Sequence, residues 1–129
     1  MWTARDHAME CGEREVGLTF SRQTNEVLLP GAMAYALPYA DGGLRITIFL
    51  DRLHPVLARN PNSRGAILGH VIAHEVVHVV QGIKRHSDLG LMKGRWSEDD
   101  FQKMGVKAMG LTPSDRLLVP KRPSQCNQR

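Results

Sequence analysis

The sequence predicts an α+β fold, with a small twisted β-sheet, a long buried helix behind it and a helical C-terminal part. Three observations support this. Residues 44–50 are rich in β-branched side chains and follow a turn, residues 64–81 carry an apolar pattern with helical period, and two helix-capping patterns come later. The length of 129 residues and the 42% hydrophobic content suit one globular domain over residues 1–129.

The N-terminal third predicts a strand and then a β-hairpin. The segment before about residue 15 has loose helical spacing, residues 16–20 are typical of a short strand, and residues 21–26 form a polar loop. Residues 32–40 are apolar, and Asp-Gly-Gly at 41–43 is a strong turn signal. Residues 44–50 begin in alternation, so the two apolar segments are expected to pair as a hairpin.

The long helix is expected from residue 64 to residue 81, with Ser63 as its N-cap and Gly82 as its C-cap. Apolar residues lie on almost all of its sides, which is typical of a buried helix. Ile67, Val71, His74 and His78 share one stripe along it.

The C-terminal part predicts two further helices. The Ser-Glu-Asp-Asp sequence at 97–100 resembles a capping box that opens a helix to about Met109, with Gly110 as its stop. The Thr-Pro-Ser-Asp sequence at 112–115 repeats the pattern before a short helix that Pro120 ends. Residues 120–129 are expected to be a flexible polar tail.

Composition and charge exclude several classes of partner. The net charge of +4 is small and the basic residues do not cluster with the few aromatic ones, so no nucleic-acid site is expected. No apolar run approaches the length of about 20 residues that a helix needs to span a bilayer. The first residues lack the apolar centre of a signal peptide, which predicts a cytoplasmic protein as the chain stands, or a secreted or periplasmic one if a leader is missing. Nothing in the sequence predicts the oligomeric state.

The two cysteines, Cys11 and Cys126, lie near opposite ends of the chain. Free buried thiols are the expected state, and a disulfide in an oxidising compartment is the alternative.

The sequence His-Glu-Val-Val-His at 74–78 carries the main chemical signal. Residues four apart on a helix project to the same side, so His74 and His78 can hold one zinc ion, with Glu75 beside it as a general base. A buried helix that happens to carry two histidines is the alternative. Two unpaired histidines and a carboxylate would be costly there, whereas a metal ion and its water satisfy them.

A catalytic zinc site usually has three protein ligands and one open position. Gly82 can reverse the chain after the helix, and His86 then has the loop length to return to the metal. Glu98 and Asp88 are the alternative third ligands, although the place of Glu98 at the start of a capped helix favours an interaction with the helix dipole. Of the remaining histidines, His70 is expected to be a core or supporting residue, and His7 and His54 are expected to lie in loops or on the surface.

The run from residue 74 to residue 92 resembles the zinc motif of the metzincin metallopeptidases, H-E-x-x-H-x-x-G-x-x-H, which a Met-turn follows. Gly82 matches the turn glycine, His86 the third ligand and Met92 the Met-turn methionine. Each gap beside Gly82 is one residue longer than in that motif. The longer form, which continues H-S-x-x-G-x-M-x-x-x-W, resembles small metzincin-like proteins predicted in bacterial genomes. The resemblance covers roughly residues 30–118 and implies that the chain is an N-terminally shortened form.

The resemblance implies a zinc-dependent peptidase that cleaves peptide or protein substrates with Glu75 as its base. Met92 can equally be an ordinary core residue. Two other functions share these residues, namely a non-catalytic binding module that zinc stabilises and a zinc hydrolase of a non-protein amide. No further cofactor is expected. Residues 32–39 are a candidate edge to which an extended substrate adds as a strand, and an ordinary hairpin strand is the alternative.

Overall fold

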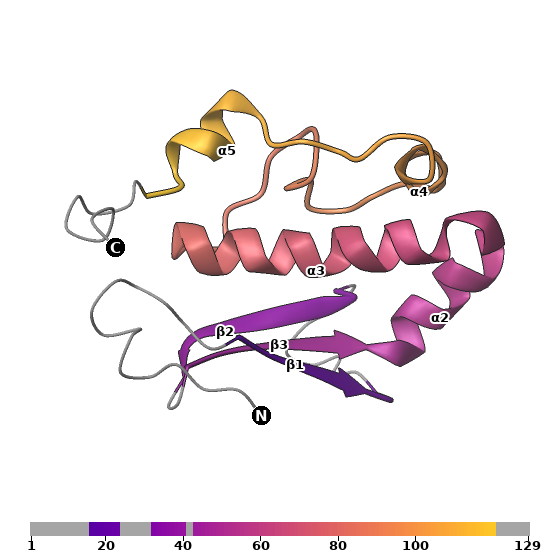
Figure 1. Ribbon diagram of the computed structural model, residues 1–129, viewed down its shortest axis with the longest axis horizontal. Helices are drawn as coiled ribbons and strands as arrows, with labels where there is room; N and C mark the ends of the chain where they lie inside the picture. Colours follow the sequence, from indigo (N-terminus) through magenta and orange to yellow (C-terminus); the bar gives the residue numbers. More distant parts are fainter. Residues whose placement is uncertain (1–15, 24–31, 41–42, 121–129) are drawn as a thin grey trace, which may run out of the picture.

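The computed structural model describes residues 16–23, 32–40 and 43–120, and within them the fold is α+β, as predicted. Figure 1 shows three strands followed by helices. The elements, in order, are β1 (Val16–Ser21), β2 (Ala34–Ala40), β3 (Gly43–Phe49), α2 (Leu50–Arg59), the 3-10 turn η1 (Pro61–Ser63), α3 (Arg64–Gln81), α4 (Glu98–Met104) and α5 (Pro113–Leu117).

The sheet is mixed and has the strand order β1-β3-β2. The central strand β3 runs parallel to β1 and antiparallel to β2, so Ile46 is paired with Leu18 on one side and with Ala36 on the other. The predicted strand and the predicted hairpin are both confirmed. β2 is an edge strand, and within the described residues no strand pairs with the side of its backbone that faces away from β3.

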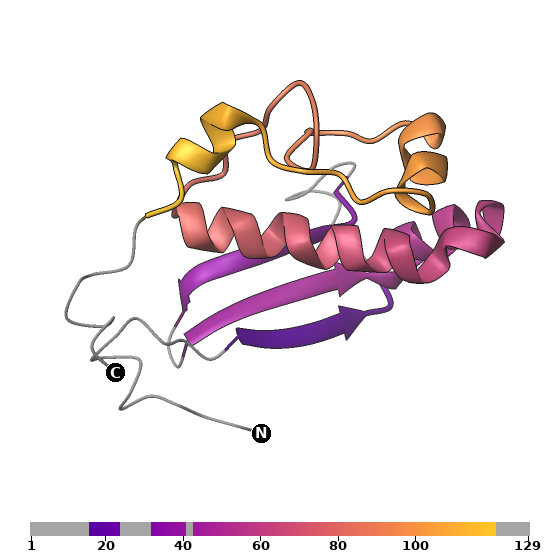
Figure 2. The same ribbon diagram turned by 45° about the horizontal axis from the view of Figure 1, so that its top comes forward.

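Helix α3 is the middle layer of the described part of the molecule. The sheet lies on one side of it and the segment that carries α4 and α5 lies on the other (Figures 1 and 2). This position explains why the sequence of the helix is apolar on almost every side. The predicted bounds, from Arg64 to Gln81, are confirmed, and Gly82 ends the helix with a φ of 73°. Ser63 is the N-cap residue, but its side chain makes no capping hydrogen bond, contrary to expectation.

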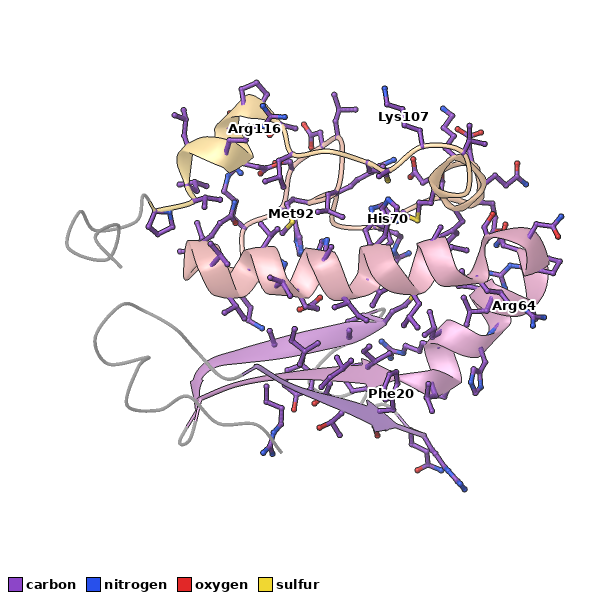
Figure 3. The ribbon with its side chains drawn as sticks, viewed as in Figure 1. Phe20, Arg64, His70, Met92, Lys107 and Arg116 are labelled. Atoms are coloured by element: carbon purple, nitrogen blue, oxygen red, sulfur yellow. The ribbon has the colours of Figure 1, made fainter. Side chains whose placement is uncertain are left out.

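The main core fills the space between the sheet, α2 and α3. Ile46, Ile48, Leu53 and Ile67 are fully buried in it. Each such side chain contributes about 1.5–3 kcal/mol relative to an exposed one. Met92 and His70 lie on the other face of α3, beneath the C-terminal segment (Figure 3), so α3 is held from both sides.

Helix α2 was not predicted, and Leu50 begins this helix instead of ending a strand. The sequence does contain a helical signal, because Leu53 and Val56 are three residues apart and both are buried. Pro55 within the helix obscures that signal, since proline normally interrupts a helix. His54 is exposed on this helix, so it is a surface residue but not a loop residue.

Helix α4 is shorter than predicted, because it ends at Met104 and not near Met109. Both predicted capping boxes are present, at Ser97 with Asp100 and at Thr112 with Asp115. After α4 the chain leaves the helical path, and the backbone N–H of Met109 donates to Nε2 of His70 at 3.0 Å. That contact ties the connecting segment to α3, which a longer helix would prevent.

Several expectations lie outside the described residues: the N-terminal helix, the turn at 41–42, His7, the states of Cys11 and Cys126, and the tail after residue 120. Among the described residues, no helix is long and apolar enough to span a membrane.

Candidate metal centre

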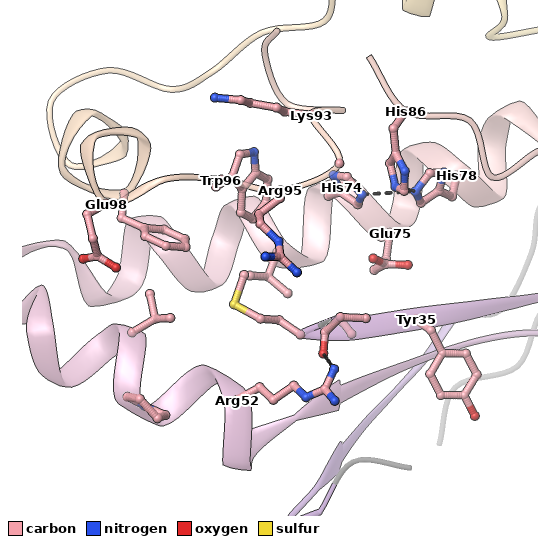
Figure 4. Close-up of a pocket in the computed structure, with 18 of the residues that line it drawn as sticks. Tyr35, Arg52, His74, Glu75, His78, His86, Lys93, Arg95, Trp96 and Glu98 are labelled. Atoms are coloured by element: carbon pink, nitrogen blue, oxygen red, sulfur yellow. Dashed lines mark hydrogen bonds between the residues drawn. The ribbon is translucent and has the colours of Figure 1, made fainter. Parts of the chain in front are cut away.

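Three histidine side chains converge at one point beside α3 (Figure 4). His74 and His78 come from successive turns of α3, and His86 comes from the loop that follows. Nε2 of His78 lies 3.1 Å from Nε2 of His74 and 3.2 Å from Nε2 of His86. One ring nitrogen from each of the three histidines lies within 4.8 Å of the other two. The three predicted ligands are therefore positioned to bind a metal ion.

Hydrogen bonds to backbone carbonyls fix which ring nitrogens face this point. Nδ1 of His74 lies 2.8 Å from the carbonyl oxygen of Leu91, and Nδ1 of His78 lies 3.2 Å from that of Ile83. A carbonyl can only accept, so each Nδ1 carries the proton and, in a neutral imidazole, each Nε2 is left with a lone pair. Two such lone pairs about 3 Å apart repel each other unless a cation lies between them.

The electrostatics of the site keep these rings neutral. Burial, as the largest cause, and the neighbouring His74 and His86 together lower the pKa of His78 to about 4. Burial also lowers the pKa of His74, although its hydrogen bond to Leu91 opposes the shift. A metal ion binds the neutral imidazole. At neutral pH these two rings therefore do not have to lose a proton before they bind a metal.

Two contacts turn the loop after α3 back towards the site. Gly82 adopts the left-handed conformation, and its N–H donates to the carbonyl of His78 at 2.9 Å. Nζ of Lys84 then donates to the carbonyl of Ala36 on β2 at 2.7 Å. The loop is thus attached to the helix at its start and to the sheet just before His86.

The carboxylate of Asp115 holds the residues on both sides of His86. Its Oδ1 accepts from Nη1 of Arg85 at 2.7 Å and from Oγ of Ser87 at 2.6 Å. Its Oδ2 accepts from the hydroxyl of Thr112 at 2.8 Å and, in the α5 capping box, from the backbone N–H of Thr112 at 3.2 Å. The Asp115 side chain is fully buried. This residue of α5 therefore holds in place the backbone on both sides of His86.

Glu75 is buried next to the histidines, with 7% of its surface exposed, and lines the adjoining cleft. In Figure 4 its carboxylate points away from α3 towards β2. Burial raises the pKa of Glu75 to about 7, and the positive charge of Lys84 acts in the opposite direction. A carboxyl group with a pKa near neutrality can both accept and release a proton.

The cleft beside the histidines has a volume of about 550 Å³. It extends from the three histidines along β2 to α2 and α4. Apolar side chains and several basic ones line it: Met33, Val56, Val71, Trp96, Phe101, Arg52, Lys84 and Arg95. A space of this size is typical of ligand sites.

The other candidate ligands lie elsewhere. Glu98 forms an ion pair with Arg59 at 2.9 Å at the far end of the cleft, and Asp88 is exposed. Neither belongs to the group of candidate metal ligands among the described residues. His70 is a buried supporting residue, as expected, because its ring bonds the carbonyl of Ala66 and the N–H of Met109.

Met92 is fully buried beneath the C-terminal segment (Figure 3). Its backbone carbonyl accepts from the N–H of Ser87 at 2.8 Å, and its neighbour Leu91 accepts from His74. The turn that contains Met92 therefore supports two of the histidines through its backbone. A Met-turn role for the Met92 side chain stays a prediction.

Sequence reasoning missed three residues around the histidines. The Trp96 ring packs edge-on against His74, with centroids 5.4 Å apart. Gly94 packs against the His86 ring, and a Cβ at this position would lie 3.4 Å from it, in ordinary van der Waals contact. The sequence predicts Asp115 only as part of a helix-capping box. Its contacts to Arg85 and Ser87 join residues about 30 positions apart, and no local pattern signals them.

No family model, curated protein or solved structure matches this chain.

Proposed function

We propose that this protein is a zinc-dependent peptidase in which His74, His78 and His86 hold the metal and Glu75 acts as the general base. The observation that carries the proposal is the convergence of three imidazole nitrogens next to a buried carboxylate at the wall of a cleft. The metzincin-like spacing of the sequence supports the same assignment and remains a resemblance.

The donor set fits zinc. Zinc–nitrogen bonds of about 2.0–2.1 Å place the nitrogens of a tetrahedral site about 3.3–3.4 Å apart. The two shortest nitrogen separations here are 3.1 and 3.2 Å. Structural zinc sites usually have four protein ligands, whereas only three candidate ligands gather here among the described residues. Three ligands beside a cleft favour a catalytic site over a purely structural one.

In the proposed peptide hydrolysis, the metal and the side chains of the protein have different roles. A bound zinc ion supplies a Lewis acid that polarises a carbonyl oxygen and lowers the pKa of water. Glu75 accepts the proton of the water that attacks the peptide carbonyl carbon, and then delivers that proton to the leaving amine. Its raised pKa suits both steps.

The edge strand β2 favours an extended peptide as the substrate. The carbonyl of Met33 accepts from the N–H of Phe49, towards β3. The carbonyls of Ala32 and Ala36 accept from side chains instead, so they point away from β3. By the alternation of a strand, the N–H and carbonyl of Ala34 point the same way, at the wall of the cleft. A peptide that adds to this edge passes beside Glu75.

The deciding experiment replaces Glu75 by Gln, which keeps the size of the side chain and removes its basicity. The zinc-loaded wild-type protein should cleave members of a mixed peptide library, as followed by mass spectrometry. The Glu75→Gln variant should bind the same amount of zinc and cleave at least 100-fold more slowly, because general-base catalysis contributes about 10²–10⁴-fold. Equal cleavage by the two proteins would exclude the role of Glu75. Zinc binding without cleavage by the wild-type protein would favour a non-catalytic zinc module.

A further inference from the structure

The cleft beside the histidines has an unbalanced charge. Five basic side chains line it, against the carboxylates of Glu75 and Glu98: Arg52, Arg59, Lys84, Lys93 and Arg95. If Glu75 serves as the base, it is not available as a permanent partner for a cation. The cleft therefore carries more basic groups than carboxylates, and two of these groups, Arg52 and Lys84, donate to the backbone carbonyls of Ala32 and Ala36.

Two of these cations are neutralised within the protein. Nη2 of Arg59 lies 2.9 Å from Oε2 of Glu98, and Nζ of Lys93 lies 2.7 Å from Oδ2 of Asp100. These two residues are therefore not expected to select the substrate.

Arg95 differs from both. It lies between the histidine loop and α4, and its guanidinium extends into the cleft on the side of α2 and α4 (Figure 4). Among the described residues, no carboxylate forms an ion pair with it. The ion pairs and hydrogen bonds that orient its neighbours leave this guanidinium available to a ligand.

Arg95 is exposed to solvent, and part of its surroundings in the cleft is apolar. Apolar side chains, among them Met33, Val71 and Phe101, line the same cleft. A charge pair beside apolar walls is less screened than one in bulk water. A guanidinium also binds a carboxylate through two parallel hydrogen bonds, whereas a basic ligand here would be repelled.

We infer that Arg95 forms a carboxylate-binding subsite, so that the cleft selects peptides with an acidic group on the α2 and α4 side of the histidines. The inference rests on the proposed peptidase function, because it assigns the occupant of that cleft. The carboxylate has two possible sources, an Asp or Glu side chain and a free peptide C-terminus.

The test measures peptide binding to the zinc-loaded Glu75→Gln variant, in which cleavage does not complicate binding. The probes are blocked hexapeptides of apolar residues that carry Glu, Gln or Lys at one position, which is moved along the peptide. A fourth set carries Gln and a free C-terminal carboxylate. Calorimetry should show that the best Glu peptide, or the free C-terminal peptide, binds about tenfold more tightly than its blocked Gln counterpart.

Substitutions of Arg95 in the same Glu75→Gln background test whether the preference for a carboxylate depends on Arg95. Arg95→Gln should abolish it and Arg95→Glu should reverse it in favour of Lys. Arg116→Gln is the matched control, because Arg116 is exposed on α5 away from the cleft (Figure 3), and it should leave the preference unchanged. Zinc content and thermal unfolding should be the same in all variants.

These experiments distinguish the absence of the Arg95 subsite from the absence of peptidase activity. Equal binding of Glu and Gln peptides, a preference that survives Arg95→Gln, or no binding of any peptide overturns the subsite. A carboxylate preference that depends on Arg95, in a protein whose wild-type form cleaves nothing, supports the subsite and rejects the peptidase. If the preference appears only with the free C-terminus, the carboxylate is terminal.

Discussion

The single residue on which the third ligand depends most is Asp115. Its carboxylate contacts Arg85 and Ser87, so it controls the position of His86 from outside the metal centre. Supporting residues of this kind influence metal affinity by about 10–100-fold. Asp115 is therefore a positioning residue and not a ligand.

Replacing Asp115 by Asn should weaken metal binding. An amide has one acceptor oxygen instead of two, so the side chain of the variant cannot accept from Arg85 and Ser87 and also from Thr112. The His86 loop therefore loses part of its support. We expect a decrease in zinc affinity of about tenfold or more, measured by competition with a chromophoric chelator. The visible spectrum of the cobalt-substituted protein should change as well, which a loss of stability alone would not cause.

Asp99→Asn is the matched control, because Asp99 is exposed and forms an ion pair with Lys103 one helical turn away. It should bind zinc as the wild type does. Wild-type affinity in the Asp115→Asn variant would show that Asp115 does not position His86.

Asp115 should also make the stability depend on pH. Burial has the largest influence on its carboxyl and raises the pKa, but the hydrogen bonds from Ser87, Thr112 and Arg85 together outweigh it. The pKa of Asp115 in the folded protein is therefore lower than the usual value for Asp, about 3.9. A group with a lowered pKa stabilises the fold above its unfolded-state pKa, and this contribution is lost as the pH falls through the folded-state value.

Urea unfolding of the metal-free wild type and of Asp115→Asn measures this contribution. The difference between their free energies of unfolding should be constant above about pH 5 and should shrink below about pH 4. The comparison cancels the other carboxylates, since both proteins carry them. A difference that stays constant down to about pH 3 would contradict the lowered pKa of Asp115.

At the level of elements, the junction between α3 and the loop decides whether the third histidine reaches the other two. Gly82 ends the helix with a φ of 73°, a conformation that costs a residue with a Cβ about 1–2 kcal/mol. The chain can therefore reverse there at low cost.

Two Gly→Ala substitutions should have opposite effects. Gly82→Ala should destabilise the protein by about 1 kcal/mol and should also weaken zinc binding, because it re-aims the loop. Gly69→Ala lies within α3, where an added Cβ meets nothing within 4 Å. That variant should be more stable than the wild type by about 0.5–1 kcal/mol, with unchanged zinc binding. Urea unfolding measures both, and a stabilising Gly82→Ala would contradict the assigned role of Gly82.

The elements that the sequence predicted well are those with local signals. The bounds of α3, both capping boxes and the spacing of His74 and His78 follow from contacts within a few residues. Helix α2 was missed because Pro55 outweighed a short apolar pattern. The end of α4 was misplaced because a distant partner, His70, determines the path of the segment after it.

At the level of the whole molecule, the metal centre is assembled from every layer. The sheet supplies the carbonyl of Ala36 that anchors Lys84, α3 supplies His74, Glu75 and His78, and the C-terminal segment supplies Asp115. This dispersion explains why one motif predicts the three candidate ligands, whereas no local pattern predicts the residues that support them. Supporting residues such as Asp115, and Arg95 with its proposed role in selectivity, become recognisable only when distant segments meet.

Because these layers must meet for the site to form, metal binding should be coupled to folding. Ligands that are fully arranged only in the folded chain favour the folded state when they bind a metal. The same coupling makes metal content a direct report on the geometry of the site.

The zinc content of the protein is the most direct test of the proposed three-histidine zinc centre. The wild type, His86→Ala and His54→Ala are loaded with zinc, passed over a chelating resin and analysed by inductively coupled plasma mass spectrometry. The wild type should retain one zinc ion per chain, as should His54→Ala, because His54 is exposed on α2 away from the site. His86→Ala should retain much less. A wild type that retains no zinc, or a His86→Ala variant that retains as much as the wild type, would contradict a three-histidine zinc centre.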